Sequence, residues 1–152
     1  MIKLIRTNSS NPDFAELVKH LDADLAEKDG DDHPFYAQFN GIDNIKYVVV
    51  AYEDIKAIGC GAIKEYLPGT MEVKRMFTSP ESRGKGIATR ILNELELWAG
   101  ELSCDKLVLE TGLKQSDAIS LYKKNGYNII SNYGPYIGIE NSFCFEKIVI
   151  AK

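Results

Sequence analysis

The 152-residue sequence contains few cysteines, and they show no pairing or metal-binding pattern. Cys60, Cys104 and Cys144 are odd in number and widely separated. They indicate neither a disulfide framework nor a zinc site, and buried free thiols are the simplest interpretation. The sequence also lacks a membrane-length apolar run of roughly 20 residues and a signal-peptide pattern. From these absences we expect a cytoplasmic, reducing location, no metal and no membrane partner.

A surplus of positive charge is also missing, since 22 acidic residues outnumber 18 basic ones and the formal charge is −4. Proteins that bind the phosphate backbone of nucleic acids usually carry a basic surplus, so no nucleic-acid partner is expected. With 45% apolar residues, the chain is long enough for one well-buried core and too short for two. We therefore expect a single domain spanning residues 1–152.

The most informative stretch runs from residue 71 to residue 99. Its first part predicts a β-strand because apolar residues alternate, although Arg75 interrupts the alternation and Pro80 ends it. The alternating residues are Met71, Val73 and Phe77. Its second part predicts an amphipathic helix that begins near Gly84, because apolar residues recur one turn apart. The recurring residues are Ile87, Ile91, Leu92, Leu95 and Trp98.

A turn rich in glycine and basic residues joins this strand to this helix. Its sequence is Arg83-Gly84-Lys85-Gly86-Ile87-Ala88. Small residues let a ligand approach the backbone, and the free N–H groups and dipole of a helix N-terminus suit a phosphate or pyrophosphate. The spacing is neither that of a nucleotide P-loop nor that of the dinucleotide fingerprint. The turn therefore indicates an anion-binding strand–turn–helix, with a solvated loop as the alternative.

The turn resembles the Arg/Gln-x-x-Gly-x-Gly/Ala signature of the GNAT superfamily of N-acetyltransferases, which holds the pyrophosphate of acetyl-coenzyme A. In this sequence the pattern is Arg83-x-x-Gly86-x-Ala88. Residues 118–127, AISLYKKNGY, resemble the family's later signature, which usually reads Asn-x-x-Ala-x-x-Leu-Tyr-x-x-x-Gly-Phe. The expected order of elements also matches the family from end to end.

The resemblance implies an α/β (α+β) GNAT fold with a mixed sheet of about seven strands, splayed at its centre, and about four helices. We expect strands at 2–6, 45–52, 57–65, 71–78, 106–111, 127–130 and 143–150. Helices are expected at 12–27, 84–99 and 116–125, the last of them capped. Residues 33–41 predict either a short further helix or a loop at the mouth of a pocket. Asn11 is expected to cap the first helix.

The resemblance also assigns residues to acetyl-coenzyme A. Backbone groups of Met76, Phe77 and Thr78 would bind its pantetheine arm and the acetyl oxygen. The pyrophosphate would lie on the N–H groups of Arg83, Gly84, Lys85, Gly86, Ile87, Ala88 and Thr89. Gln115 stands where the family more often has Asn and would contact the coenzyme. Lys124 would reach a coenzyme phosphate, with solvation at the surface as the alternative.

Two residues are candidates for proton transfer. In the family the tyrosine at the position of Tyr122 points its hydroxyl at the thioester sulfur, so Tyr122 is the expected general acid; packing against a strand is the alternative. A phenol, with a reference pKa near 10, suits that role. An alkyl amine is protonated at neutral pH, so a base is needed, and Glu72 is the candidate. An ion pair with Lys74 is the competing interpretation for Glu72, and a water chain to Glu72 or Glu110 is an alternative route.

Aromatic residues in two loops are candidate contacts for the acceptor. Phe35 and Tyr36 follow an acidic segment at 27–32, and core packing is their competing interpretation. Tyr133 and Tyr136 lie in a Gly-Pro loop before the last strand, where we expect much of the substrate choice to reside. His33 is a weak catalytic candidate, because a single histidine is more often structural.

These features together predict an N-acetyltransferase that moves an acetyl group from acetyl-CoA to a primary amine of a small molecule or a peptide or protein, by direct attack in a ternary complex. The alternative is a non-catalytic acyl-CoA-binding sensor with the same fold. An acetyltransferase directed at nucleic acid is disfavoured by the acidic balance. The sequence leaves the acceptor, the acyl group and the oligomeric state open, although homodimers are common in the family.

Overall fold

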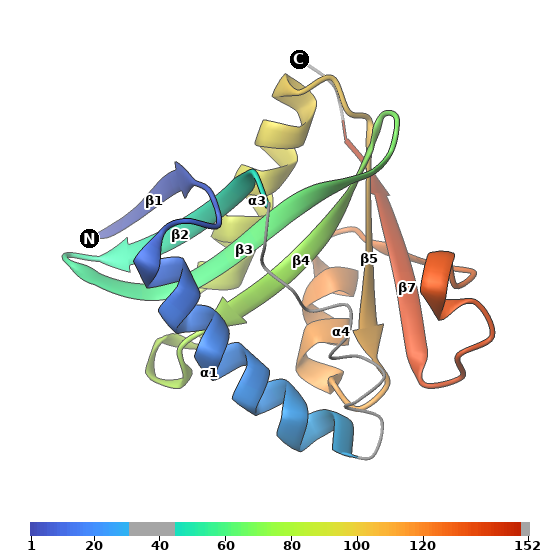
Figure 1. The fold of residues 1–152 in the computed structure, drawn as a ribbon, viewed down its shortest axis with the longest axis horizontal. Coiled ribbons are helices and arrows are strands. Elements are labelled where there is room, and N and C mark those ends of the chain that lie inside the picture. The colour runs from blue at the N-terminus through green and yellow to red at the C-terminus, as the bar shows by residue number, and fades with distance from the viewer. Residues whose placement is uncertain (31–44, 150–152) are drawn as a thin grey trace.

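The computed structural model describes residues 1–30 and 45–149. Seven strands form one mixed sheet in the order β1-β2-β3-β4-β5-β7-β6 (Figure 1). The strands are β1 (Ile2–Thr7), β2 (Tyr47–Glu53), β3 (Lys56–Leu67), β4 (Thr70–Thr78), β5 (Lys106–Gly112), β6 (Asn128–Ile130) and β7 (Ser142–Ile148). The helices are α1 (Pro12–Asp29), α3 (Ile87–Glu101) and α4 (Ser116–Lys124), with 3-10 turns η2 (Pro80–Ser82) and η3 (Gly134–Tyr136). The predicted fold class is confirmed, with three α-helices in the described ranges against about four expected. The segment expected to hold a further helix, residues 33–41, lies outside those ranges.

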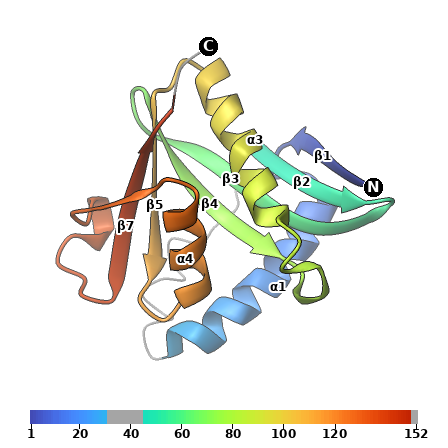
Figure 2. The ribbon, with the colours of Figure 1, turned by 180° about the vertical axis from the view of Figure 1, so that it is seen from behind.

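The helices cover opposite faces of the sheet. In Figure 1 helix α1 crosses the near face, and the reverse view in Figure 2 shows α3 and α4 on the other. Helix α1 begins as predicted: Asn11 accepts hydrogen bonds from the backbone N–H groups of Asp13 and Phe14, and Pro12 occupies the first turn. The apolar face of α1 packs on β2, β3 and β4 through the buried residues Phe14, Leu17, Val18 and Leu21.

Met71, Val73 and Phe77 of strand β4 are buried at alternate positions as expected, but they do not all enter the same core. Met71 and Val73 pack in the core that contains α3, whereas Phe77 packs in the core under α1. The cause is a β-bulge, in which Arg75 and Met76 together oppose the single residue Gly61 of β3. Arg75 has a φ of +60°. After Arg75 the alternation is reversed, so that odd-numbered residues face α1 instead of α3.

The sheet splits between its two central strands. Parallel strands β4 and β5 pair only from Thr70–Lys106 to Glu72–Val108, and the rest of β4 has no partner on that side. Strand β5 meanwhile pairs with β7 along its whole length, from Lys106 to Gly112. The splayed centre expected from the sequence is therefore confirmed, and its closed end lies at Glu72.

Helix α3 begins at Ile87, three residues later than predicted from the position of Gly84. Gly84 and Gly86 have φ angles of +80° and +77°, a left-handed conformation that cannot continue a right-handed helix. The two glycines therefore form an open turn between η2 and α3. Gly86 is the N-cap residue, and no side-chain hydrogen bond caps the helix there among the described residues.

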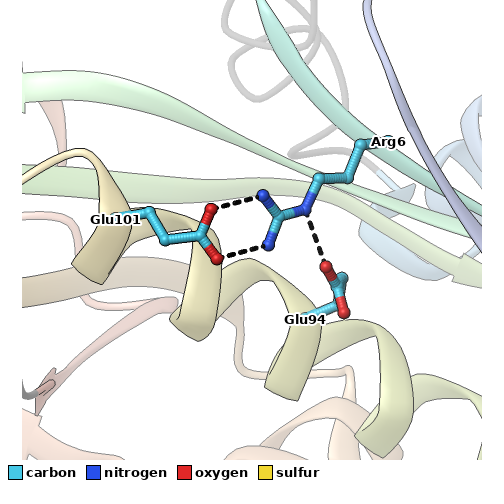
Figure 3. A network of polar contacts seen from close by, with 3 residues as sticks. All are labelled: Arg6, Glu94 and Glu101. Carbon is cyan, nitrogen blue, oxygen red and sulfur yellow. Dashed lines mark hydrogen bonds and ion pairs between the residues drawn. The ribbon is translucent and has the colours of Figure 1, made fainter. Parts of the chain in front are cut away.

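The far end of α3 is tied to the edge of the sheet by Arg6 of β1 (Figure 3). The two terminal nitrogens of Arg6 donate to the two carboxylate oxygens of Glu101, at 2.7 Å and 3.0 Å, and its Nε donates to Glu94 at 2.7 Å. The guanidinium carbon lies 4.8 Å from the centroid of the Trp98 ring, and the Glu101 hydrogen bond raises the pKa of Arg6. This network links the C-terminal half of α3 to strand β1.

The three cysteines are free and buried, as predicted. Burial raises the pKa of Cys60 to about 12 and that of Cys144 to about 11, so these thiols remain protonated at neutral pH. Residues 1–30 and 45–149 contain no group of three or more potential metal ligands. In the same ranges, no helix combines the length and the apolar character needed to cross a membrane.

The bulge predicts a specific effect of Gly61→Ala. The added methyl group would overlap Sδ of Met76 and would lie 2.8 Å from Cγ2 of Ile91, so the core under α3 would have to shift. We expect the free energy of unfolding to fall by about 1–3 kcal/mol, measured by urea denaturation. The control is Lys64→Ala, an exposed residue of the same strand. Equal midpoints for the two variants would show that the close approach at Gly61 carries no cost.

Candidate active site

A groove of about 560 Å³ lies where β4 and β5 separate. Helix α1, strands β4 and β5, the glycine turn, helix α4 and turn η3 all contribute to its lining. It brings together most of the residues assigned to a coenzyme from the sequence. These are Met76, Phe77, Thr78, Arg83, Gly84, Gly86, Ile87, Ala88, Thr89, Gln115, Tyr122 and Lys124. Lys85 does not line the groove, and its side chain is exposed.

The predicted proton-transfer and acceptor residues are partly assembled in the same groove. Glu72, Tyr122 and Tyr136 line it. Tyr133 lies directly behind this lining, against Tyr136, with the two ring centroids 5.8 Å apart. His33, Phe35 and Tyr36 lie outside the described residues.

The glycine turn forms an open end of the groove. A Cβ atom added to Gly84 or Gly86 would meet nothing within 4 Å, so the backbone there is accessible from one side. Arg83 is held back toward β4: its Nε donates to the carbonyl oxygen of Thr78 at 2.8 Å, and its guanidinium lies 5.6 Å from the Phe77 ring centroid. Arg83 and the first residues of α3 thus line the same end of the groove.

Tyr122 both packs against the sheet and lines the groove, so the two interpretations of this residue apply together. Its ring contacts Tyr127 and Phe145, with centroid distances of 5.7 Å and 6.0 Å. Burial, with a smaller contribution from the negative charge of Glu110, raises the pKa of Tyr122. The phenol is therefore protonated at neutral pH and can act as a proton donor, but not as a base, there.

Asn125 joins the two helices of this side, a role that the sequence did not reveal. Its Nδ2 donates to Oγ1 of Thr89 in α3 at 3.2 Å and to the carbonyl oxygen of Leu121 in α4 at 2.8 Å. Asn125 is the C-cap residue of α4, and Gly126 follows it with a φ of +88°. The expected side-chain cap at the other end of α4 is absent, because Gln115 makes no capping hydrogen bond.

Glu72 has a partner on each carboxylate oxygen. The hydroxyl of Tyr133 donates to Oε2 at 2.5 Å, and Nζ of Lys74 lies 3.6 Å from Oε1. The ion pair with Lys74 was the competing interpretation from the sequence, and it is present. The bond from Tyr133 was not foreseen, since a loop 61 residues away gives no local signal. Burial first, and then the charge of Glu72, raise the pKa of Tyr133, so this hydroxyl stays protonated.

Helix α1 supplies two carboxylates to the basic residues beside the groove. Asp22 pairs with Arg75, whose side chain is 2% exposed, and Asp24 lies 3.9 Å from a terminal nitrogen of Arg83. In the sequence, the only indication of these pairings is that Asp22 and Asp24 lie outside the apolar face of α1. Buried arginine needs such a partner, because an unpaired charge in the interior is strongly destabilising.

The sequence profile described as "Acetyltransferase (GNAT) family" matches residues 14–127. A 100-residue region is 39% identical to an IAA acetyltransferase of Azospirillum brasilense, and it covers 65% of this chain. The same region covers 65% of the length of that relative.

Solved structures share the fold over nearly the whole chain. A Klebsiella pneumoniae protein, provisionally named an acyl-CoA N-acyltransferase, superposes with a TM-score of 0.83 at 27% identity over 99% of both chains. PaiA N-acetyltransferase of Thermoplasma acidophilum, solved in complex with coenzyme A, has a TM-score of 0.69. It is 19% identical over 97% of this chain and 99% of its own, so this likeness concerns the fold alone.

The pairing of Asp22 with Arg75 makes a testable prediction. Asp22→Asn removes the charge opposite a buried guanidinium, and we expect the free energy of unfolding in urea to fall by about 1–3 kcal/mol. Glu16→Gln, on an exposed position of the same helix, should change it by less than about 0.5 kcal/mol. A loss no larger than that of Glu16→Gln would contradict the assigned role of Asp22.

Proposed function

Because the chain belongs to the GNAT acetyltransferase family, we propose that it is an acetyl-CoA-dependent N-acetyltransferase. Its acceptor is a primary amine of a small molecule or of a peptide or protein, which attacks directly in a ternary complex. We take residues 1–152 as one catalytic domain. The observation that carries the proposal is the groove between β4 and β5, which begins at an uncapped helix start and ends beside a carboxylate.

The residues at the open end of the groove fit a diphosphate. Gly84 and Gly86 leave the backbone accessible, and the amides of Ile87, Ala88 and Thr89 belong to the first turn of α3, where helical N–H groups lack partners within the helix. Lys124 adds positive charge from α4, and Arg83 adds it from the turn. Gln115 borders the same space with an amide that can donate and accept.

The middle of the groove fits an extended arm. Beyond Glu72, strand β4 has no partner on its β5 side, so the backbone groups of Met76, Phe77 and Thr78 border the split. An arm lying there would pair with β4 as an added strand does. Acetyl-CoA, when bound, supplies the thioester; the chain orients it and excludes water from the closed end.

Two side chains of the groove carry out the proton transfers in this proposal. Glu72 accepts the proton of the acceptor ammonium, directly or through water, and Tyr133 holds its other oxygen in place. Tyr122, whose phenol is protonated at neutral pH, donates its hydroxyl proton to the departing thiolate. Tyr136 lines the groove and would contact the acceptor.

The proposed activity is tested by a thiol-release screen with acetyl-CoA against spermidine, kanamycin, free amino acids and lysine peptides. We expect turnover with at least one amine, together with heat on calorimetric titration with coenzyme A. The buried cysteines should add little background, because burial raises their pKa and shields them from the thiol reagent. Binding without turnover would favour the acyl-CoA sensor, and the absence of binding would refute both functions.

Tyr122→Phe separates an enzyme from a sensor. We expect kcat to fall by about 100-fold, because the proton donor for the thiolate is lost while the ring packing is kept. The calorimetric Kd for coenzyme A should stay nearly unchanged. The control is Tyr127→Phe, which removes the hydroxyl of the neighbouring ring outside the groove lining. Equal turnover in the two variants would remove Tyr122 from the mechanism.

A further inference from the structure

Lys74 places a primary amine of the protein beside the candidate base. Its Nζ lies 3.6 Å from Oε1 of Glu72, and both side chains are largely buried, at 16% and 14% exposed. Both residues line the groove. An acceptor amine in the proposed reaction would need this same position next to Glu72.

The position of Lys74 along β4 is also that of the expected acetyl group. The turn proposed to hold the diphosphate follows the end of β4, and the arm would run back along Thr78, Phe77 and Met76 toward the closed end of the split. That end lies at Glu72, the last residue of β4 that pairs with β5. A thioester just beyond Met76 therefore lies next to Lys74 and Arg75. Arg75 is paired with Asp22, and a guanidinium is too weakly nucleophilic to compete.

Other lysines of the groove lack this combination of neighbours. Lys28 pairs with Asp24 on α1 at 3.2 Å and is 37% exposed. Lys124 is in the last turn of α4, on the side assigned to the coenzyme phosphates. Only Lys74, among the lysines that line the groove in the described ranges, has an ion pair with Glu72.

Glu72 is oriented so that one oxygen remains directed at an amine. Tyr133 holds Oε2 through a 2.5 Å hydrogen bond, and its raised pKa keeps the donor protonated. The ammonium of Lys74 approaches the other oxygen, Oε1, at the looser distance of 3.6 Å. Because 3.6 Å is longer than a hydrogen bond, the proton passes from Lys74 to Glu72 after the two side chains close to hydrogen-bond distance or through one bridging water, while Tyr133 keeps the carboxylate in place.

We propose that Lys74 is a self-acetylation site of this protein; this inference rests on the proposed function. Glu72 takes one proton from the Lys74 ammonium, and the neutral nitrogen forms a bond to the acetyl carbon of acetyl-CoA. The carbon–sulfur bond breaks, the nitrogen loses its second proton to solvent as the amide forms, and the coenzyme A thiolate takes a proton from Tyr122. Solvent then supplies a new proton to Tyr122 and removes the one on Glu72, so the net products are Nε-acetyl-Lys74, the coenzyme A thiol and one proton.

The modification changes the charge of the groove at its closed end. An acetylated Lys74 is neutral and cannot pair with Glu72, and its amide occupies the space next to that carboxylate. Self-acetylation therefore blocks the position that an external amine must reach. It links the activity of the groove to how long the protein holds acetyl-CoA without an acceptor.

The test incubates the full chain with acetyl-CoA and no acceptor, and follows each lysine by peptide mass spectrometry over time. Lys64 is the internal reference for uncatalysed acetylation, because it lies opposite Glu72 in the β3–β4 register, is exposed and does not line the groove. We expect Lys74 to gain an acetyl group at least about tenfold faster than Lys64, as a positioned base implies. Glu72→Gln should remove that difference in rate. Lys74→Arg should leave the acetylation rates of the other lysines unchanged.

The outcomes separate this inference from the proposed function. Equal rates at Lys74 and Lys64 in a protein that binds coenzyme A by calorimetry would overturn the self-acetylation site and leave the coenzyme site intact. A faster rate at Lys74 that persists in Glu72→Gln would overturn the assigned role of the base. No calorimetric binding of coenzyme A would refute the proposed function, and the inference would fall with it.

Discussion

The short contact between β4 and β5 is the constraint on which the rest of the structure depends. Two parallel strands that paired fully would close the sheet and leave no groove between them. Here the pairing stops at Glu72 and Val108, while β3 and β7 keep the outer sides of the two strands satisfied. The unpaired backbone of β4 is therefore confined to one interval, which opens onto the groove between β4 and β5.

A split sheet needs other contacts to hold its halves together, and these contacts also position the site. Arg6 anchors the distal end of α3 to the β1 edge, through two glutamates and the face of Trp98. At the opposite end of α3, Asn125 connects Thr89 to α4, which covers the β5 half. The helix thus spans the break in the sheet, and its first turn is held at the open end of the groove.

Local sequence patterns predicted most of the architecture, because caps, glycines and apolar periodicity act over a few residues. The cap at Asn11, the helix expected at 12–27 and the order of strands along the chain follow from such patterns, and the helix continues two residues further, to Asp29. The partner of Glu72 could not be read in this way, because Tyr133 reaches it from a distant loop through tertiary packing. The core that Phe77 enters could not be read locally for a related reason: the bulge depends on what β3 offers opposite Arg75, and that is Gly61.

The bulge also makes strand β4 intolerant of changes in length. Because two residues of β4 oppose Gly61, the extra residue sets which side chains after it face α1 and which face α3. Deleting one residue there would turn Phe77 toward the other core and shift the glycine turn by one residue along the strand. An insertion or a deletion in this strand would therefore disrupt both layers at once.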